Sequence, residues 1–268
     1  MSNQLALIFV LIMLLLAALF YAVSLIKKRR RKAAFKLPFP PAWEAHITKH
    51  VSLYKSLPQA LQDELKGHIN VFLSEKYFEG HNGIEITDEM RVVVAAQACL
   101  LLLNRETNYF PHLKTIMMYP SAFRNPNSEQ AHLGNLGESW TRGPVVLSWG
   151  HSLHGGKNDN DGSNLVIHEF AHQLDQEDGV GDGTPMLEHG HIRTWAKVLS
   201  KEFNSLKIKK KCKRKSFFNK YGATNAAEFF AVISEHFFEQ PKTFKKKHPD
   251  LYAELTKYYK LDPIDWAD

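Results

Sequence analysis

The sequence predicts an α+β fold that is mostly helical, contains a small sheet and follows one transmembrane helix. Three observations predict it: an uncharged apolar run near the N-terminus, apolar residues at helical spacing in most of the remaining chain, and two short strand-like runs in the middle. The chain has 268 residues, 44% of them hydrophobic and 23% charged. That composition is typical of a globular protein and excludes a disordered, collagen-like or disulfide-scaffold chain.

Residues 5–26 form the first predicted element, a transmembrane helix. They include no charged residue, and Ser24 is the only clearly polar side chain among them. At 1.5 Å per residue the helix is roughly 33 Å long, enough to cross the ~30 Å hydrocarbon core of a bilayer. The alternative is a cleaved signal peptide, but residues 1–4 lack Lys and Arg, and the run exceeds a usual signal core. We therefore expect residues 1–26 to be an uncleaved anchor.

Six consecutive Lys and Arg residues occupy positions 27–32, directly after this run. The positive-inside rule places them in the cytoplasm and the N-terminus outside, which predicts a single-pass protein of the inner (plasma) membrane. Anionic lipids would attract each basic residue by about 1 kcal/mol. The formal net charge of the whole chain is also +6, so no basic surface for nucleic acid is expected. Only Cys99 and Cys212 are present, which suits a reducing compartment.

Residues 27–42 are predicted to be a basic and proline-rich linker, and residues 43–268 a single globular domain. Pro38, Pro40 and Pro41 favour an extended spacer from Ala33 onward. Within the domain, helical spacing predicts helices over 43–54, 61–78, 92–103, 165–174, 192–203 and 226–238, and strands are expected over 115–119 and 145–149. Thr87 is the expected N-cap of the third of these helices.

Residues 207–215 are the second strongly basic segment, with seven Lys or Arg in nine positions. A run of like charges is typical of a solvated loop or a frayed helix end. The alternative is a second contact with the anionic membrane surface.

The pentapeptide His168-Glu169-Phe170-Ala171-His172 is the main indication of chemistry. It lies in an apolar frame without Gly or Pro, so a helix is expected, and on a helix both imidazoles project from one face. Two histidines so placed can bind one metal ion, and Glu169 beside them can accept a proton from an activated water. The pattern also occurs by chance, and a purely structural His pair with an ion-paired Glu is the alternative.

A catalytic zinc usually has three protein ligands, so a third is required. A metzincin would have Gly three and His six residues after His172, but Asp175 and Asp178 occupy those positions. Glu228 and Glu235 are seven residues apart in a very apolar segment, where a buried carboxylate needs a partner or a metal. Glu228 is the favoured ligand, and Glu235 the favoured partner of a ligating His. A pair of surface or ion-paired glutamates is the alternative.

Two segments, residues 164–175 around His168-Glu169-Phe170-Ala171-His172 and residues 227–238 around Glu228 and Glu235, resemble the MtfA family of zinc metallopeptidases. The resemblance extends from about Trp43 to the C-terminus and implies a zincin-like catalytic core, related to that of anthrax lethal factor. It implies that the two histidines and Glu228 bind Zn²⁺ and that Glu169 is the catalytic base. It also implies that Tyr221, seven residues before Glu228, assists the oxyanion.

The expected activity is therefore hydrolysis of a peptide or protein substrate by a gluzincin-type zinc peptidase, in which an HExxH motif is combined with a downstream Glu. Asp175 is the alternative third ligand, although a role behind His172 is favoured. The strand over 145–148 is expected to pair with an extended substrate backbone. The best-known family member is cytosolic and also binds the glucose repressor Mlc. A regulatory module that sequesters a protein partner is thus the second hypothesis, and a purely structural zinc protein the third.

Overall fold

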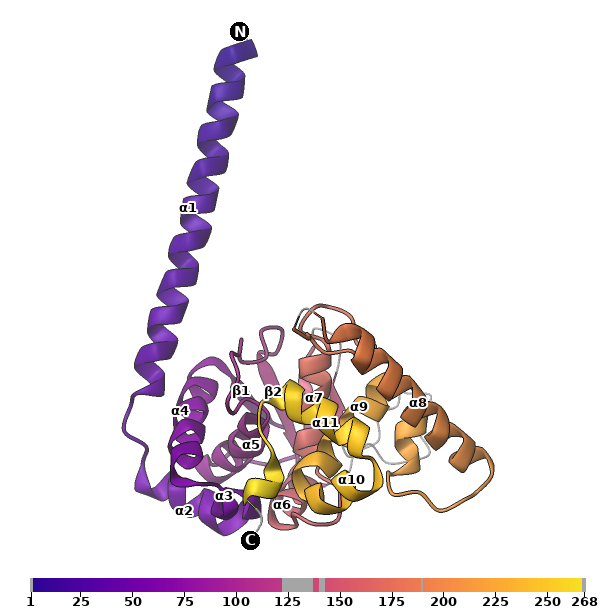
Figure 1. The fold of residues 1–268 in the computed structure, drawn as a ribbon. Helices are drawn as coiled ribbons and strands as arrows, with labels where there is room; N and C mark the ends of the chain where they lie inside the picture. Colours follow the sequence, from indigo (N-terminus) through magenta and orange to yellow (C-terminus); the bar gives the residue numbers. More distant parts are fainter. Residues whose placement is uncertain (1, 122–136, 140–142, 189, 267–268) are drawn as a thin grey trace.

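The computed structural model describes residues 2–121, 137–139, 143–188 and 190–266 (Figure 1). It is mostly helical with one small sheet, as the sequence predicts. The α-helices are α1 (Ser2–Phe35), α2 (Pro41–His50), α3 (Ser52–Ser56), α4 (Gln59–Glu75), α5 (Asp88–Leu100), α6 (Trp149–Lys157), α7 (Leu165–Asp175), α8 (Ile192–Lys211), α9 (Ala226–Glu239), α10 (Pro241–Lys247) and α11 (Pro249–Tyr259). Two 3₁₀ helices are η1 (Lys220–Ala223) and η2 (Pro263–Trp266), and the strands are β1 (Tyr77–Gly80), β2 (Thr115–Tyr119), β3 (Gly137–Ser139) and β4 (Val145–Ser148).

The sheet has the strand order β1-β2-β4-β3. Strands β1, β2 and β4 run parallel, and β3 pairs antiparallel with the other side of β4. All four residues of β4 are buried, and its neighbours occupy both of its edges. The prediction that this strand pairs with substrate is therefore wrong, because its hydrogen-bonding groups already belong to the sheet.

The expected strand over 145–149 ends one residue early, since Trp149 begins α6. The polar stretch between the two predicted strands lies mostly outside the described residues. Helix α5 is confirmed together with its N-cap, because the Thr87 hydroxyl accepts a hydrogen bond from the backbone N–H of Met90 (3.3 Å). Cys99 within α5 is fully buried.

The helix predicted over 43–54 is divided at Val51, whose extended backbone separates α2 from α3. The helix predicted over 61–78 ends at Glu75, and the next residues form β1. Lys76 explains this ending, because its backbone is extended and its buried ammonium donates to the carbonyls of Phe110 and Leu113 (2.8 Å each). Long-range contacts of this kind override local helical spacing.

Helix α1 differs from the predicted anchor-plus-spacer arrangement because it continues through the basic run to Phe35. Arg31 forms a bidentate ion pair with Glu75 of α4 (2.7 and 2.9 Å), and the Phe35 ring packs edge-on against His68. A Cβ on Gly67 would lie 2.6 Å from the Phe35 ring, so any larger residue at this position would displace the ring from its present place. The foot of α1 is thus packed against the domain, and the extended part of the spacer begins only after Phe35.

Helix α7 crosses the centre of the domain, where it packs along α9 and against α5 (Figure 1). Phe170 on α7 is completely buried, with its ring 4.9 Å from Phe110 and 5.6 Å from Phe72. This aromatic cluster fixes α7 in the core on the side that carries no histidine, and so determines where the two histidines lie.

We predict that Phe170→Ala lowers the free energy of unfolding by about 3–5 kcal/mol, because it removes a buried ring and leaves a cavity. Phe170→Leu should cost less than about 1.5 kcal/mol, and Tyr77→Ala on the exposed face of β1 about 0.5 kcal/mol or less. Urea unfolding of the detergent-solubilised chain, followed by tryptophan fluorescence, measures all three. Equal losses for Phe170→Ala and Tyr77→Ala would contradict the assignment of Phe170 to the core.

Candidate metal centre

Helix α7 presents His168 and His172 on one face. Its N-cap Asn164 accepts a hydrogen bond from the backbone N–H of Ile167 (3.0 Å), so the helix begins at Leu165, three residues before the first histidine. The two imidazole centroids are 4.9 Å apart, as expected for side chains one helical turn apart. The helical placement predicted for this motif is observed.

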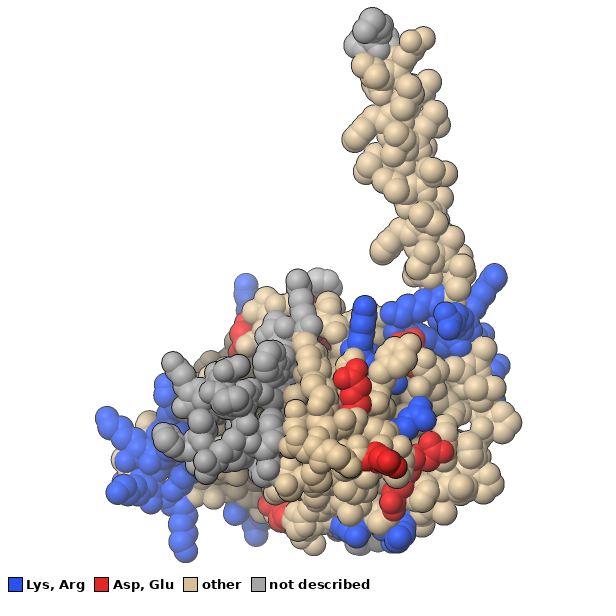
Figure 2. Space-filling model, turned by 180° about the vertical axis from the view of Figure 1, so that it is seen from behind, with Lys and Arg blue, Asp and Glu red and all other residues tan. Residues whose placement is uncertain are grey.

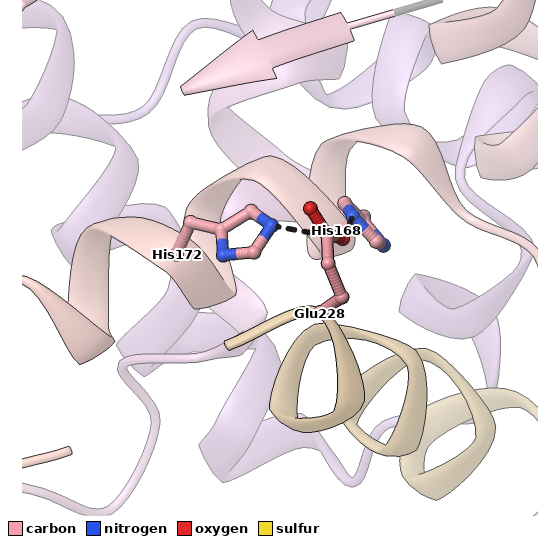
Figure 3. A group of neighbouring side chains, drawn as sticks. All are labelled: His168, His172 and Glu228. Carbon is pink, nitrogen blue, oxygen red and sulfur yellow. Dashed lines mark hydrogen bonds and ion pairs between the residues drawn. The ribbon is translucent and has the colours of Figure 1, made fainter. Parts of the chain in front are cut away.

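Helix α9 brings Glu228 opposite the two histidines (Figure 3). Asn225 caps this helix by accepting from the backbone N–H of Glu228 (2.8 Å), which places Glu228 in the first turn. Its Oε2 lies 3.0 Å from Nε2 of His168 and 3.4 Å from Nε2 of His172. One ligand atom from each of the three residues lies within 4.8 Å of the others, so the carboxylate and both imidazoles face one common point.

Glu235 holds His168 from behind. Its Oε1 lies 2.8 Å from Nδ1 of His168, and its Oε2 accepts from the backbone N–H of Asn164 (2.7 Å). A carboxylate at Nδ1 favours a proton on that nitrogen, so Nε2 is the nitrogen that would give up its proton to bind a metal. The same side chain therefore orients the ring and joins α9 to the N-terminus of α7.

The protonation states of His168 and Glu228 depend strongly on each other. Burial alone would lower the pKa of the His168 imidazole, but the carboxylates of Glu235 and Glu228 hold that pKa well above its usual value. Burial alone would raise the pKa of Glu228, but hydrogen bonds from His168 and His172 hold it well below the usual range. The centre is thus built to hold positive charge between α7 and α9.

The residues present fit a divalent metal ion. Two imidazole nitrogens and one carboxylate oxygen are the donor set of many catalytic zinc sites, which keep a further position open. The low pKa of Glu228 keeps the carboxylate ionised, as a ligand must be. Within the described residues, this is the one group of histidine, cysteine or acidic side chains close enough to share an ion.

Glu169 and Tyr221 lie next to these three residues. Glu169 follows His168 on α7, is 4% exposed, and is close enough for its charge to raise the pKa of His168. Tyr221 comes from η1, where its hydroxyl donates to Oε1 of Glu228 (3.2 Å) and its side chain is 37% exposed. A buried carboxylate and a hydroxyl that reaches solvent therefore both adjoin the centre.

Asp175 lies one turn beyond His172 but turns to a different partner. It is fully buried, and its Oδ2 accepts from the backbone N–H of Gly183 (2.9 Å). Burial raises the pKa of Asp175 to about 6. The hydrogen bond from Gly183 and the charge of nearby His172 act in the opposite direction and offset only part of this rise. The structure thus gives Asp175 a role in holding the loop after α7, and Glu228 rather than Asp175 faces the two histidines.

Glu239 is a functional candidate that sequence reasoning missed. Its Oε2 accepts from the backbone N–H groups of Gly162 and Ser163 (3.0 Å each), directly before the N-cap of α7. Burial, with the charge of Glu235, raises the pKa of Glu239 to about 9. The signal was present in the sequence, because Glu239 continues the face of α9 that begins at Glu228 and Glu235.

A family model described as glucose-regulated metallo-peptidase M90 matches residues 25–260. The chain belongs to this metallopeptidase family. An uncharacterized protein from Synechocystis sp. is 38% identical over 245 residues, which cover 88% of this chain and 89% of that protein. Mlc titration factor A from Klebsiella pneumoniae is 29% identical and that from Escherichia coli O7:K1 28%, each over 83% of this chain and 86% of the relative. The resemblance to the MtfA family is confirmed.

We predict that Glu235→Gln weakens metal binding about 10- to 100-fold, because the His168 ring loses the carboxylate that orients it. A chelator-competition titration with Zn²⁺ measures the change. Glu202→Gln is the matched control, since Glu202 pairs with His248 away from the centre (2.8 Å) and its loss should leave metal affinity unchanged. Equal affinity of Glu235→Gln and the native chain would show that Glu235 does not support the site.

Proposed function

We propose that this chain is a zinc-dependent peptidase tethered to the cytoplasmic face of the membrane. The observation that carries the proposal is the convergence of His168, His172 and Glu228 on one point, with Glu169 next to the first histidine. This is the gluzincin-type arrangement of a zincin-like core, in which an HExxH helix and a later helix share the ligands. Membership of a metallopeptidase family gives the reaction class.

The catalytic roles follow from the positions of the side chains. Zinc, when bound by His168, His172 and Glu228, supplies Lewis acidity to the carbonyl and the attacking water. Glu169 accepts the proton of that water and then passes it to the nitrogen of the leaving amine. Tyr221 donates its hydroxyl hydrogen bond to the developing oxyanion, for which it must leave Oε1 of Glu228. The partial exposure of Tyr221 leaves room for this change.

The substrate backbone needs an unpaired strand edge, which β4 does not offer. Within the described part of the sheet, β3 is the outer strand on the β4 side, and α7 packs against it. We therefore propose that an extended substrate adds to β3 by main-chain hydrogen bonds. Strand β3 thus takes the substrate-pairing role that was expected for β4, and it lies close to the helix that carries the two histidines.

Helix α1 supports the membrane anchor. Among the described residues, it is the one helix that is long and apolar enough to cross a bilayer. The domain buries none of the apolar stretch of this helix. Leu15 is 71% and Phe20 79% exposed, which is costly in water and favourable in lipid. The basic run over 27–32 supports a domain on the cytoplasmic side, as the positive-inside rule expects. Lipid contact then comes from α1 and this run.

A second candidate function is the capture of a regulatory protein. The relatives from Klebsiella and Escherichia are named Mlc titration factor A, a name that refers to a protein partner. We propose it as the alternative for this chain, with the metal centre retained for structure. The partner would be a protein, such as a transcriptional repressor, held at the membrane.

We predict that Glu169→Gln lowers the cleavage rate about 10²- to 10⁴-fold, because the general base is lost, while metal content and fold persist. Cleavage of a peptide library by the full-length chain in detergent, read by mass spectrometry, measures the rate, and metal analysis provides the control. Unchanged cleavage by this variant would contradict the role of Glu169 as the general base. Partner capture that survives in this variant would support the second candidate function.

We predict that Cys212 reacts with a membrane-impermeant maleimide only after cells are permeabilised. Cys212 is exposed at the end of α8, whereas Cys99 is buried, so the native chain carries one reporter thiol on its domain. Cys212→Ser controls for labelling of Cys99. Labelling of Cys212 in intact cells would place the domain outside and contradict the proposed topology.

A further inference from the structure

The end of α8 and the turn that follows form a basic lobe, defined here as the seven residues Lys207, Lys209, Lys210, Lys211, Lys213, Arg214 and Lys215. All except Lys209 are exposed. Lys207 lies over the ring of Phe203 (5.3 Å), but within the part of the chain that the structure describes none of the seven forms an ion pair. Lys209 is near enough to Glu202 for its charge to lower the pKa of that carboxyl group, and the other six residues form a concentration of positive charge at the surface.

The surrounding sequence offers no anion to this lobe. Residues 192–248 contain fifteen Lys or Arg and only four acidic residues, all glutamates. Glu202 pairs with His248, Glu228 and Glu235 hold the histidines, and Glu239 holds the loop before α7. Since the fold already uses each glutamate elsewhere, the lobe is complementary to an external anion.

The lobe lies close to the metal centre along the chain and in space. Leu206, directly before it, packs beside η1, where a Cβ on Gly222 would lie 3.5 Å from its Cδ2. A shallow hollow of about 580 Å³ between them is lined by Asn204, Lys207, Ile208, Lys210, Lys211 and Ala223. Ala223 is two residues from Tyr221, which corresponds to roughly 4 Å along a 3₁₀ helix. Tyr221 in turn contacts Glu228.

We propose that the basic lobe binds acidic side chains of the polypeptide substrate, so that the enzyme selects acidic segments beside the cleaved bond. The inference rests on the proposed peptidase function and adds the substrate class. An extended peptide advances about 3.3 Å per residue, so a substrate that passes Tyr221 and continues along η1 brings the side chains on one side of the bond to the hollow. The apolar wall formed by Ile208 and Ala223 accommodates their methylene groups, and the lysines at its rim pair with their carboxylates.

Two other anions fit the position of the lobe less well. Figure 2 shows one basic cluster at the foot of α1 and another at the opposite side of the domain. The second cluster also lies lower in this view than the foot of α1, away from the side on which α1 leaves the domain, and the attraction of a lipid surface fades within about 8–10 Å in physiological salt. Nucleic-acid strands are held by aromatic stacking as well as charge, but the residues that line the hollow are all non-aromatic.

The test compares two labelled peptides that differ only in a flank of four Glu or four Gln. Their binding to full-length Glu169→Gln protein in detergent is measured by fluorescence anisotropy. We expect the Glu peptide to bind about tenfold more tightly at low salt, since each exposed ion pair contributes modestly and several act together. Added salt should remove the difference.

The charge-reversal variant is Lys210→Glu with Lys211→Glu, which leaves the Lys207–Phe203 contact in place. It should lose the preference for the Glu peptide. The matched control is Lys49→Glu with Lys55→Glu on α2 and α3, which makes the same charge change at exposed positions far from α8 (Figure 1). This control should keep the preference.

Equal binding of the two peptides by the native lobe, or a preference that persists after charge reversal, overturns the proposal. Loss of the preference in phosphatidylserine-rich nanodiscs but not in neutral ones assigns the lobe to lipid instead. Displacement of the Glu peptide by duplex DNA at a lower concentration than by poly-glutamate assigns it to nucleic acid. Failure of the native chain to cleave any library peptide refutes the peptidase proposal separately, because the anisotropy measurement does not depend on cleavage.

Discussion

The contact between α7 and α9 is the constraint on which the rest of the site depends. Three glutamates along one face of α9 reach across it: Glu228 to both histidines, Glu235 to His168 and Asn164, and Glu239 to the backbone before α7. Carboxylates in such an apolar helix are stable only when each has a partner. The same contacts that satisfy these buried carboxyl groups therefore also set the direction of the imidazoles and the start of the helix that carries them.

Acidic and basic residues are used in different parts of the molecule. The basic run at the foot of α1 is next to the proposed membrane surface, and Arg31 within it is also paired with Glu75. The acidic residues of the region 192–248 are used inside the fold, so that its lysines and arginines are left for the surface. A net charge of +6 does not reveal this segregation, because the acidic residues elsewhere in the domain offset the basic lobe.

The sequence was sufficient for the parts of the site that depend on local spacing. The intervals of four and seven residues placed His168, His172, Glu228 and Glu235 on helical faces, and the structure brings the two faces together. Pairing across the sheet was not predictable, because β4 becomes an inner strand only through β3, a three-residue strand without a strong pattern. The extension of α1 depends on Arg31 and Phe35 contacting α4, and helix periodicity alone cannot indicate such a contact.

The central claim is that two imidazoles from α7 and one carboxylate from α9 hold a single zinc ion. X-ray absorption at the zinc edge of the purified full-length chain tests it most directly, because the spectrum reports the ligand atoms themselves. The account predicts one zinc per chain, with a first shell of two imidazole nitrogens and oxygen, and loss of the imidazole signal when His168 and His172 are both replaced by Ala. A chain that takes up no zinc, or a shell with sulfur or without imidazole, would contradict it.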